Sequence, residues 1–391
     1  MKKIKEFASL KNGYAFKSKN YVKQGIRIIR IANVQDGYVV DDAPCFYPEN
    51  SSENITQYQL FENDLLISLT GNAGRVALLP KTMLPAALNQ RVCCLRIDET
   101  IVNRKYLFYY LRRKQFVKDC IDASKGVAQL NLSTKWLEDY EVPVPSIAEQ
   151  KRIVARIEEL FSQLDKAVET LQMVKEQLAV YRQAVLKDAF AQYNELIKIR
   201  ECSEVVTSGS RGWAKYYSDE GAKFIRIGNL TRDSISIKLE DVQYVMLPDT
   251  AEGRRTRLKK NDVLVSITAD LGSIGFVQDN LGEAYINQHI ALVRFLKPEL
   301  GNFMAWYLKS DWGQKHLLKN KRGAGKLGLG LDDIRDTLVP KILGEDAKQT
   351  VDLIDKRLSF CADIETTINN LLIKTEAMRQ SILKQAFEGK W

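Results

Sequence analysis

The stretch LFENDLLISLTGNAGRV, residues 60–76, occurs a second time in altered form as LKKNDVLVSITADLGSI, residues 258–274. Both contain an Asn-Asp pair followed by a Ser-x-Thr motif, and the offset between the two aspartates is 262 − 64 = 198. Each stretch is typical of a short β-strand between turns, because an apolar run lies between Asn, Asp and Gly residues. A duplication of this kind decides the fold, since both copies are expected to form the same structure.

The repeat extends outward from these stretches over the whole chain. Residues 28–33 match residues 224–229, and residues 88–96 match residues 286–294. Further on, each copy contains a Val-Pro pair, an Arg-Gln pair and an Ala-Phe pair in the same order. We therefore expect an α+β fold with an internal pseudo-two-fold repeat, in which each copy begins as a β-rich mixed domain and ends in a helix.

The end of each copy predicts a long helix. Residues 148–192 contain neither Pro nor Gly, and their apolar residues recur in steps of three and four, which is typical of a heptad seam. Residues 345–391 continue the same pattern in the second copy, interrupted at Arg357 and Thr375. We expect one antiparallel coiled coil, because the first helix leads into the second domain and the second helix follows it. The expected seam residues are Ile157, Leu164, Leu171 and Leu178 in the first helix and Ile354, Ile364, Ile368 and Leu371 in the second.

The predicted domain order is therefore head, helix, head, helix. Head 1 covers residues 1–147 and is followed by a spacer helix over residues 148–192, while head 2 covers residues 193–344 and is followed by a spacer helix over residues 345–391. Proline residues at the end of each head mark the boundaries, because Pro has no backbone N–H and therefore interrupts a helix or a strand.

The composition favours a polyanionic partner. The chain has 391 residues, with 58 Lys and Arg against 49 Asp and Glu, and a formal net charge of +9. No apolar stretch is long enough for a membrane span or a signal peptide, so we expect a cytoplasmic protein. The six cysteines include no CxxC pair, which predicts reduced thiols without disulfides or zinc. The chain contains only two histidines, so a catalytic site based on histidine has almost no candidate residues.

Basic and amide residues beside the turns are the candidates for DNA contacts, because Lys and Arg neutralise phosphates and Arg, Lys, Asn and Gln read base edges. These candidates are Lys11, Asn12, Lys17, Lys19, Asn72, Arg75 and Lys125 in the first copy and Arg211, Lys215, Arg254, Arg255, Arg257, Arg322 and Lys326 in the second. The two Asn-Gln pairs, at residues 89–90 and 287–288, suit adenine chemically, but their presence in both copies favours hydrogen bonding within the fold. His289 replaces Arg91 in the matched strand, and the scarcity of possible catalytic partners favours a packing or DNA-facing role over catalysis.

This organisation resembles the specificity subunits of type I restriction-modification systems. The resemblance covers the whole chain and rests on the repeated segments at residues 61–68 and 261–266, the Asn-Gln pairs, a Leu-x-Leu segment before Val-Pro, and helices that end Arg-Gln-Ala-Val-Leu and Arg-Gln-Ser-Ile-Leu. It implies that each head is a target-recognition domain reading one half of a bipartite DNA site. The helices would set the half-site spacing and hold two modification subunits, through which restriction subunits join. S-adenosylmethionine, ATP and Mg²⁺ would then belong to the partner chains, and no cofactor to this one.

Two other classes of function remain open at this point. The chain could be a coiled-coil interaction scaffold without DNA specificity, or an enzyme acting alone on nucleic acid. The second class has little support, because the Gly-x-Gly-x-x-Gly match at residues 323–328 lacks a strand-turn-helix context. The acidic residues near Arg254 are better interpreted as a surface loop than as a nuclease site. We therefore expect a non-catalytic subunit.

Overall fold

The computed structural model describes residues 1–50, 55–124, 131–209, 211–248, 251–278, 281–319, 321 and 327–389. The chain divides into two compact units, of which unit 1 comprises residues 1–171 and 370–391 and unit 2 comprises residues 172–369. Each unit contains one head, part of the helix that follows this head, and part of the helix from the other copy.

Head 1 has two four-stranded sheets in the orders β2-β9-β6-β7 and β4-β3-β8-β5, and a two-stranded sheet β1-β10. Its strands are β1 (Lys2–Lys3), β2 (Ala8–Asn12), β3 (Ile26–Ile29), β4 (Phe46–Tyr47), β5 (Gln59–Leu60), β6 (Leu65–Ser68), β7 (Val76–Leu78), β8 (Ala86–Leu88), β9 (Val92–Ile97) and β10 (Glu141–Val142). Its α-helices are α1 (Arg104–Leu111), α2 (Lys114–Ala123) and α3 (Thr134–Asp139), and its 3-10 helices are η1 (Ile4–Glu6), η2 (Ser18–Asn20), η3 (Ile31–Asn33), η4 (Thr56–Tyr58) and η5 (Lys81–Met83).

Head 2 repeats the order of the central sheet as β12-β19-β16-β17 and has the further sheets β13-β15-β14-β18 and β11-β20, of which β15-β14-β18 corresponds to β4-β3-β8 of head 1. Its strands are β11 (Leu196–Lys198), β12 (Ser203–Ser208), β13 (Tyr217–Ser218), β14 (Ala222–Ile225), β15 (Gln243–Val245), β16 (Val263–Ser266), β17 (Ile274–Phe276), β18 (Ala284–Ile286), β19 (Ile290–Phe295) and β20 (Leu338–Pro340). Its helices are α5 (Ile199–Cys202), α6 (Ala251–Thr256), α7 (Gly301–Lys309), α8 (Asp311–Leu317) and α9 (Leu331–Arg335), with the 3-10 helices η6 (Trp213–Tyr216), η7 (Ile227–Asn229) and η9 (Pro298–Leu300).

The repeated apolar run forms the central strand of each head. All four residues of β6 are buried, because alternate side chains face two different cores. Leu65 and Ile67 belong to the core that includes α1, whereas Leu66 belongs to the core beneath the second sheet. In head 2, Val263 and Leu264 divide between two cores in the same way. This double burial explains why the run is apolar at successive positions and not at alternate ones.

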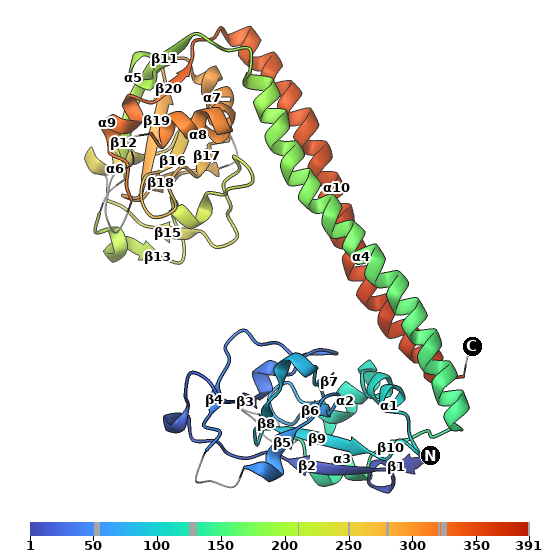
Figure 1. Cartoon of the computed structure of the whole chain (residues 1–391). Coiled ribbons are helices and arrows are strands. Elements are labelled where there is room, and N and C mark those ends of the chain that lie inside the picture. The colour runs from blue at the N-terminus through green and yellow to red at the C-terminus, as the bar shows by residue number, and fades with distance from the viewer. Residues whose placement is uncertain are drawn as a thin grey trace. The chain divides into compact units, whose positions relative to one another are not determined.

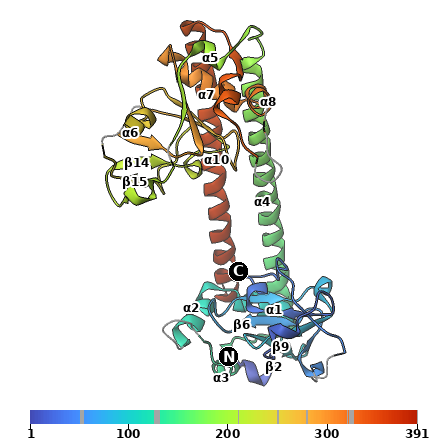
Figure 2. The ribbon, with the colours of Figure 1, turned by 90° about the vertical axis from the view of Figure 1, so that its left-hand side faces the viewer.

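The two long helices are α4 (Ile147–Phe190) and α10 (Gly344–Phe387), and both appear in Figures 1 and 2. In unit 2 they run antiparallel, because partners with rising numbers on α4 have falling numbers on α10. Three side-chain contacts show this order: Lys175 with Asn369 at 3.2 Å, Arg182 with Glu365 at 2.6 Å, and Asp188 with Arg357 at 3.2 Å. In unit 1, the other parts of the same helices are joined by the ion pair of Asp165 with Arg379.

The buried face of these helices follows the expected seam residues except at Leu371. Ile157, Leu178, Ile354 and Ile368 are buried and Leu164, Leu171 and Ile364 are half-buried, whereas Leu371 is 41% exposed. In place of Leu371 the neighbouring Leu372 is half-buried, and the same one-residue shift selects Phe161 over Leu160 and Val168 over Ala167. Thr375, which interrupts the apolar pattern, is nevertheless buried, and its hydroxyl donates to the carbonyl of Leu371 at 2.9 Å. At the three places of the one-residue shift the more buried residue lies one position later than the apolar pattern predicts, whereas Val174 and Ile364 are half-buried at the predicted positions.

Each long helix ends against the aromatic residues of the other copy's head. Phe190, at the end of α4, packs edge-on against Phe303 and Tyr307 of α7, with ring centroids 5.2 and 5.4 Å apart. The repeat-related Phe387, at the end of α10, packs in the same way against Tyr106 and Tyr110 of α1, at 5.2 and 5.1 Å. The first helix therefore completes head 2, and the second helix completes head 1.

The described cysteines are free thiols, and four of the six are buried. Burial raises the pKa of Cys93 to about 12, which keeps this thiol protonated at neutral pH. No helix within the described ranges is both long enough and apolar enough to cross a membrane.

Replacing Phe190 with Ala should destabilise unit 2. The side chain is only 3% exposed, and removal of a buried Phe costs about 3–5 kcal/mol because a cavity remains. Chemical denaturation monitored by tryptophan fluorescence would measure the change, with Phe360→Ala as control, since Phe360 is 66% exposed on α10. Equal stability of the two variants would contradict the packing role of Phe190.

Candidate nucleic-acid interface

Several loops of head 1 leave the central sheet at the same end, which we call the loop end. Asn12, the last residue of β2, pairs with Cys93. Ile67, near the end of β6, pairs with both Cys93 and Val76. The register therefore brings together the segment after β2, the turn between β6 and β7, and the turn before β9.

Head 2 has an equivalent loop end. Ser208, the last residue of β12, pairs with Ala291, and Val265 pairs with both Ala291 and Ile274. The segment after β12, the turn between β16 and β17 and the turn before β19 thus gather as in head 1. One further segment reaches each loop end, through isolated bridges between residues 70 and 131 and between residues 268 and 328.

The described candidates of head 1 belong to these loops or to the adjoining strand end. The exposed ones are Lys11, Asn12, Lys17, Lys19 and Asn72. Arg75 differs from them, because it is half-buried and its guanidinium donates to the side-chain oxygen of Gln35 at 2.8 Å. Arg75 therefore fixes the turn between β6 and β7 against the loop after η3.

The candidates of head 2 divide between the segment after β12 and the region of α6. Arg211 and Lys215 are exposed in the first, and Lys215 lies over the ring of Tyr216 at 4.9 Å. The exposed residues of the second are Arg254, Arg255 and Arg257. The guanidinium of Arg255 donates to the hydroxyl of Thr207 at 2.8 Å, and Arg257 lies 3.6 Å from the Glu283 carboxylate. The Arg255 contact brings α6 to the loop end. Lys125, Arg322 and Lys326 lie outside the described residues.

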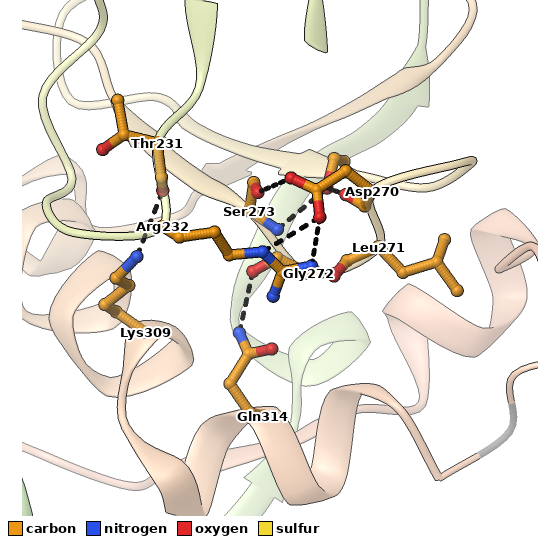
Figure 3. Close-up of polar contacts among 9 residues, drawn as sticks. Thr231, Arg232, Asp270, Leu271, Gly272, Ser273, Lys309 and Gln314 are labelled. Carbon is orange, nitrogen blue, oxygen red and sulfur yellow. Dashed lines mark hydrogen bonds and ion pairs between the residues drawn. The ribbon is translucent and has the colours of Figure 1, made fainter. Parts of the chain in front are cut away.

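A polar network holds the turn between β16 and β17 in head 2 (Figure 3). Arg232, in the loop after η7, forms an ion pair with Asp270 and also donates to the carbonyl of Leu271 at 2.6 Å. The hydroxyl of Ser273 donates to Asp270 at 2.7 Å, and the amide of Gln314 from α8 donates to the carbonyl of Gly272 at 2.8 Å. Together with Ser273, Arg232 holds the pKa of Asp270 below its usual value, so the carboxylate stays charged.

At the matched positions beneath this network, head 1 has an ion pair, whereas head 2 has two positively charged residues. In head 1, Arg112 pairs with Asp36 at 3.0 Å. The repeat-related residues of head 2 are Lys309 and Arg232, which would repel each other. Arg232 pairs with Asp270 instead, and Lys309, only 8% exposed, donates to the carbonyl of Thr231 at 3.1 Å. Burial lowers the pKa of Lys309 to about 8.

Sequence reasoning missed Arg232, Asp270 and Gln314. Asp270 could have been noticed, because it occupies the repeat position of the candidate Asn72. No local pattern indicates Arg232 or Gln314, since their partners lie 38 and 42 residues away in the sequence. Among the residues that the structure describes, no cluster of three or more His, Cys, Asp or Glu could hold a metal ion.

The comparisons with known proteins agree with this architecture. Residues 1–176 match the family model of the type I restriction modification DNA specificity domain. The chain is thus similar to specificity subunits of type I restriction-modification systems. It is 26% identical to the EcoBI specificity subunit of Escherichia coli, over 98% of this chain and 84% of that protein. It is 32% identical to the EcoAI specificity subunit of Escherichia coli, over 40% of this chain and 27% of that protein.

Two solved structures share the fold of this chain. One comes from a study of complex assembly and conformational transition in a type I restriction-modification system, with a TM-score of 0.73, 16% identity, and coverage of 98% of this chain and 96% of that one. The other is the HsdS subunit from Thermoanaerobacter tengcongensis, with a TM-score of 0.54, 16% identity, and coverage of 100% and 96%.

Replacing Lys309 with Met should remove a pH dependence from the stability of this chain. With a pKa of about 8 in the fold against 10.5 in the unfolded chain, Lys309 binds fewer protons when folded within this window. The free energy of unfolding should therefore rise with pH from about 8 to about 10.5, by up to ~3 kcal/mol.

Denaturation of the wild type and of Lys309→Met across this pH range would measure the effect as the difference between the two proteins. Lys297→Met serves as the matched control, because Lys297 is exposed in the same head. If the free energies of unfolding of the wild type and of Lys309→Met changed in parallel with pH, the lowered pKa of a buried Lys309 would be contradicted.

Proposed function

We propose that this specificity subunit reads a bipartite, asymmetric DNA site, with one half-site for each head, and recruits modification and restriction subunits to it. The observation that carries the proposal is that the two heads share one backbone framework but differ in the residues of their loops. Both heads have the same central-sheet order and an equivalent loop end, yet Arg75 and Gln35 fix the turn in head 1, where Asp270 and Arg232 fix it in head 2. Two heads built alike but lined differently are suited to two different half-sites.

The charge of the loop ends supports DNA as the ligand. Exposed Lys11, Lys17 and Lys19 in head 1, and Arg211 and Lys215 in head 2, are flexible cations of the kind that neutralise phosphates. Amide side chains beside them, such as Asn72, can reach base edges. In this proposal S-adenosylmethionine, ATP and Mg²⁺ are bound by the partner subunits, and the specificity subunit contributes the sequence recognition.

Methylome sequencing of cells that express this chain with its cognate modification subunit tests the proposal. We expect a split motif whose two halves differ in sequence, because the loop ends of the heads differ. A motif made of two identical inverted halves would contradict one distinct half-site for each head. The absence of any chain-dependent motif would contradict DNA specificity itself.

Replacing Arg211 and Lys215 with Ala should weaken DNA binding by the full chain and flatten its salt dependence. Each lost phosphate contact lowers the slope of log K against log salt by about 0.9. Titration of a duplex containing the modified motif at several salt concentrations would measure the slope. An unchanged slope in a folded variant would remove this segment from the interface.

The control for this titration is the pair Lys259→Ala and Lys297→Ala. Both residues are exposed in head 2, but they lie next to the start of β16 and the end of β19, at the sheet end opposite the loops. Their removal lowers the net charge by the same amount and should leave the slope nearly unchanged. A pure scaffold, the alternative interpretation, would show no salt-dependent binding for any of these proteins.

The long helices offer a surface for partner subunits. Val180 on α4 and Phe360 and Ile373 on α10 are 71%, 66% and 70% exposed. Large apolar side chains exposed on helices that already bury one face are suited to a further protein partner. This supports docking of the modification subunits on the helices, through which the restriction subunits join the complex.

Replacing Val180 and Phe360 with Glu should prevent assembly with the modification subunits. The stability of the isolated chain should change by less than about 0.5 kcal/mol, because both side chains are largely exposed. Size-exclusion chromatography of the coexpressed subunits would measure assembly. Gln163→Glu with Thr366→Glu, at exposed polar positions of the same helices, is the control. Normal assembly of the Val180 and Phe360 variant would contradict docking at these positions.

A further inference from the structure

The turn before the long strand of each central sheet has the same construction in both heads. We call it the Asn turn, and it comprises residues 89–91 in head 1 and 287–289 in head 2. Its first residue is a buried asparagine, with Asn89 8% and Asn287 9% exposed. The side-chain oxygen of each asparagine accepts from the backbone N–H two residues later, at 3.4 Å in head 1 and 3.2 Å in head 2. The shared asparagines are therefore structural, as their presence in both copies predicts.

Three further backbone bonds fix the turn in head 1. The N–H of Asn89 donates to Ile29 at 3.1 Å, and its carbonyl accepts from Val92 at 3.0 Å. The carbonyl of Arg91 accepts from Leu69 at 3.0 Å. These bonds involve β3, β9 and the turn after β6, so the backbone at Arg91 has little freedom to move.

The same three bonds recur in head 2. The N–H of Asn287 donates to Ile225 at 3.2 Å, and its carbonyl accepts from Ile290 at 3.2 Å. The carbonyl of His289 accepts from Ile267 at 2.9 Å. The two heads therefore hold the third residue of the turn in equivalent backbone positions.

A glycine packs directly on each Asn turn. A Cβ atom at Gly13 would lie 2.1 Å from the carbonyl oxygen of Asn89, and a Cβ atom at Gly209 would lie 2.2 Å from that of Asn287. Both distances are far too short for any side chain, so only glycine allows the segment after β2 or β12 to approach so closely. This segment carries candidate cations in each head, and the Asn turn therefore lies among the loops proposed to contact DNA.

Both heads have a glutamine at the second position of the turn and differ at the third position, which is Arg91 in head 1 and His289 in head 2. Gln90 and Arg91 are exposed in head 1. In head 2, His289 is half-buried, with Nδ1 2.7 Å from the hydroxyl of Thr268 and Nε2 2.9 Å from the side-chain nitrogen of Gln288. An amide nitrogen only donates, so Nε2 accepts, and the proton is assigned to Nδ1, which donates to Thr268. His289 thereby fixes the amide of Gln288.

The threonine beside the turn shows the same difference. Thr70 occupies the repeat position of Thr268, but its hydroxyl oxygen is buried and has no hydrogen-bond partner among the described residues. Arg91 does not reach inward to satisfy it, whereas His289 reaches inward to Thr268. The side chain at the third position of the turn is thus directed outward in head 1 and inward in head 2.

We propose that the Asn turn is a specificity-determining element of each head: Arg91 reads a guanine in the first half-site, and Gln288, oriented by His289, reads an adenine in the second. This inference rests on the proposed function, since it identifies which residues read bases. An arginine places two parallel donors that match the O6 and N7 acceptors of guanine. A glutamine amide pairs in the same two-point manner with N6 and N7 of adenine. His289 is a positioning residue, because it acts through Gln288.

The test replaces the third residue of the Asn turn in one head at a time. Each variant is made in the full chain and is assembled with its cognate modification subunit. Binding to duplexes randomised at each base pair of both half-sites gives the preference at every position. Arg91→Ala should lower the discrimination at one guanine position of the first half-site by on the order of 10- to 100-fold. The second half-site, read by the unchanged head, is the internal control.

In head 2, His289→Arg should move the preference at one position of the second half-site from adenine to guanine. Gln288→Ala should relax the preference at that same position and at no other. Asn287→Ala is the structural control: it should destabilise head 2 and weaken binding at all positions of its half-site, without changing which bases are preferred.

The outcomes separate this inference from the proposed function. If the wild-type complex shows no bipartite preference, the proposed function fails. If it shows one and Arg91→Ala and His289→Arg retain the wild-type preference at every position, the function stands and the assignment of the Asn turn is overturned. A uniform loss of binding by the His289→Arg variant, with preferences unchanged, would also overturn it, because that result indicates a structural role only.

Discussion

The packing of each helix end on the opposite copy's head is the interaction on which the rest of the structure depends. Phe190 and Phe387 occupy equivalent places between two aromatic rings of α7 and α1. Because each helix must leave one head and end in the other, the two helices are required to run antiparallel. Burial of aromatic rings is among the larger stabilising contributions that a single side chain makes. The arrangement also makes the two copies structurally equivalent although one follows the other in the chain.

Within each head, a conserved backbone arrangement is combined with divergent surface chemistry. The central strands β6 and β16 are buried on both faces, so nearly every substitution there would disturb one core or the other. The loop ends have no such constraint, and even their supporting ion pairs differ, as Arg112 with Asp36 and Arg232 with Asp270 show. This divergence leaves Lys309 in an unfavourable environment. Its amine is buried, and no carboxylate among the described residues is close enough to form an ion pair with it, so the pKa of Lys309 is lowered.

The sequence was sufficient to predict the repeat, the α+β class and the two long helices, because these depend on periodic patterns that extend over many residues. It was not sufficient for the seam register. Leu160 and Phe161 are adjacent and both apolar, as are Leu371 and Leu372, so the pattern alone does not decide which member of each pair is buried. The basic candidates were found by their position beside turns, but contacts such as Arg255 with Thr207 depend on topology, which joins residues 48 positions apart.

The division of the chain into units has a consequence for biosynthesis. Unit 2 is one continuous segment, residues 172–369, whereas unit 1 needs residues 370–391 in addition to residues 1–171. A ribosome releases the N-terminal residues first, and domains generally fold as their residues emerge. Head 1 must therefore wait for residues 370–391 before α10 can cover the aromatic residues of α1, so the head that is synthesised first is completed after head 2. Loss of residues 370–391 would leave unit 2 whole and unit 1 with an uncovered aromatic face, which is the kind of surface that chaperones and proteases recognise.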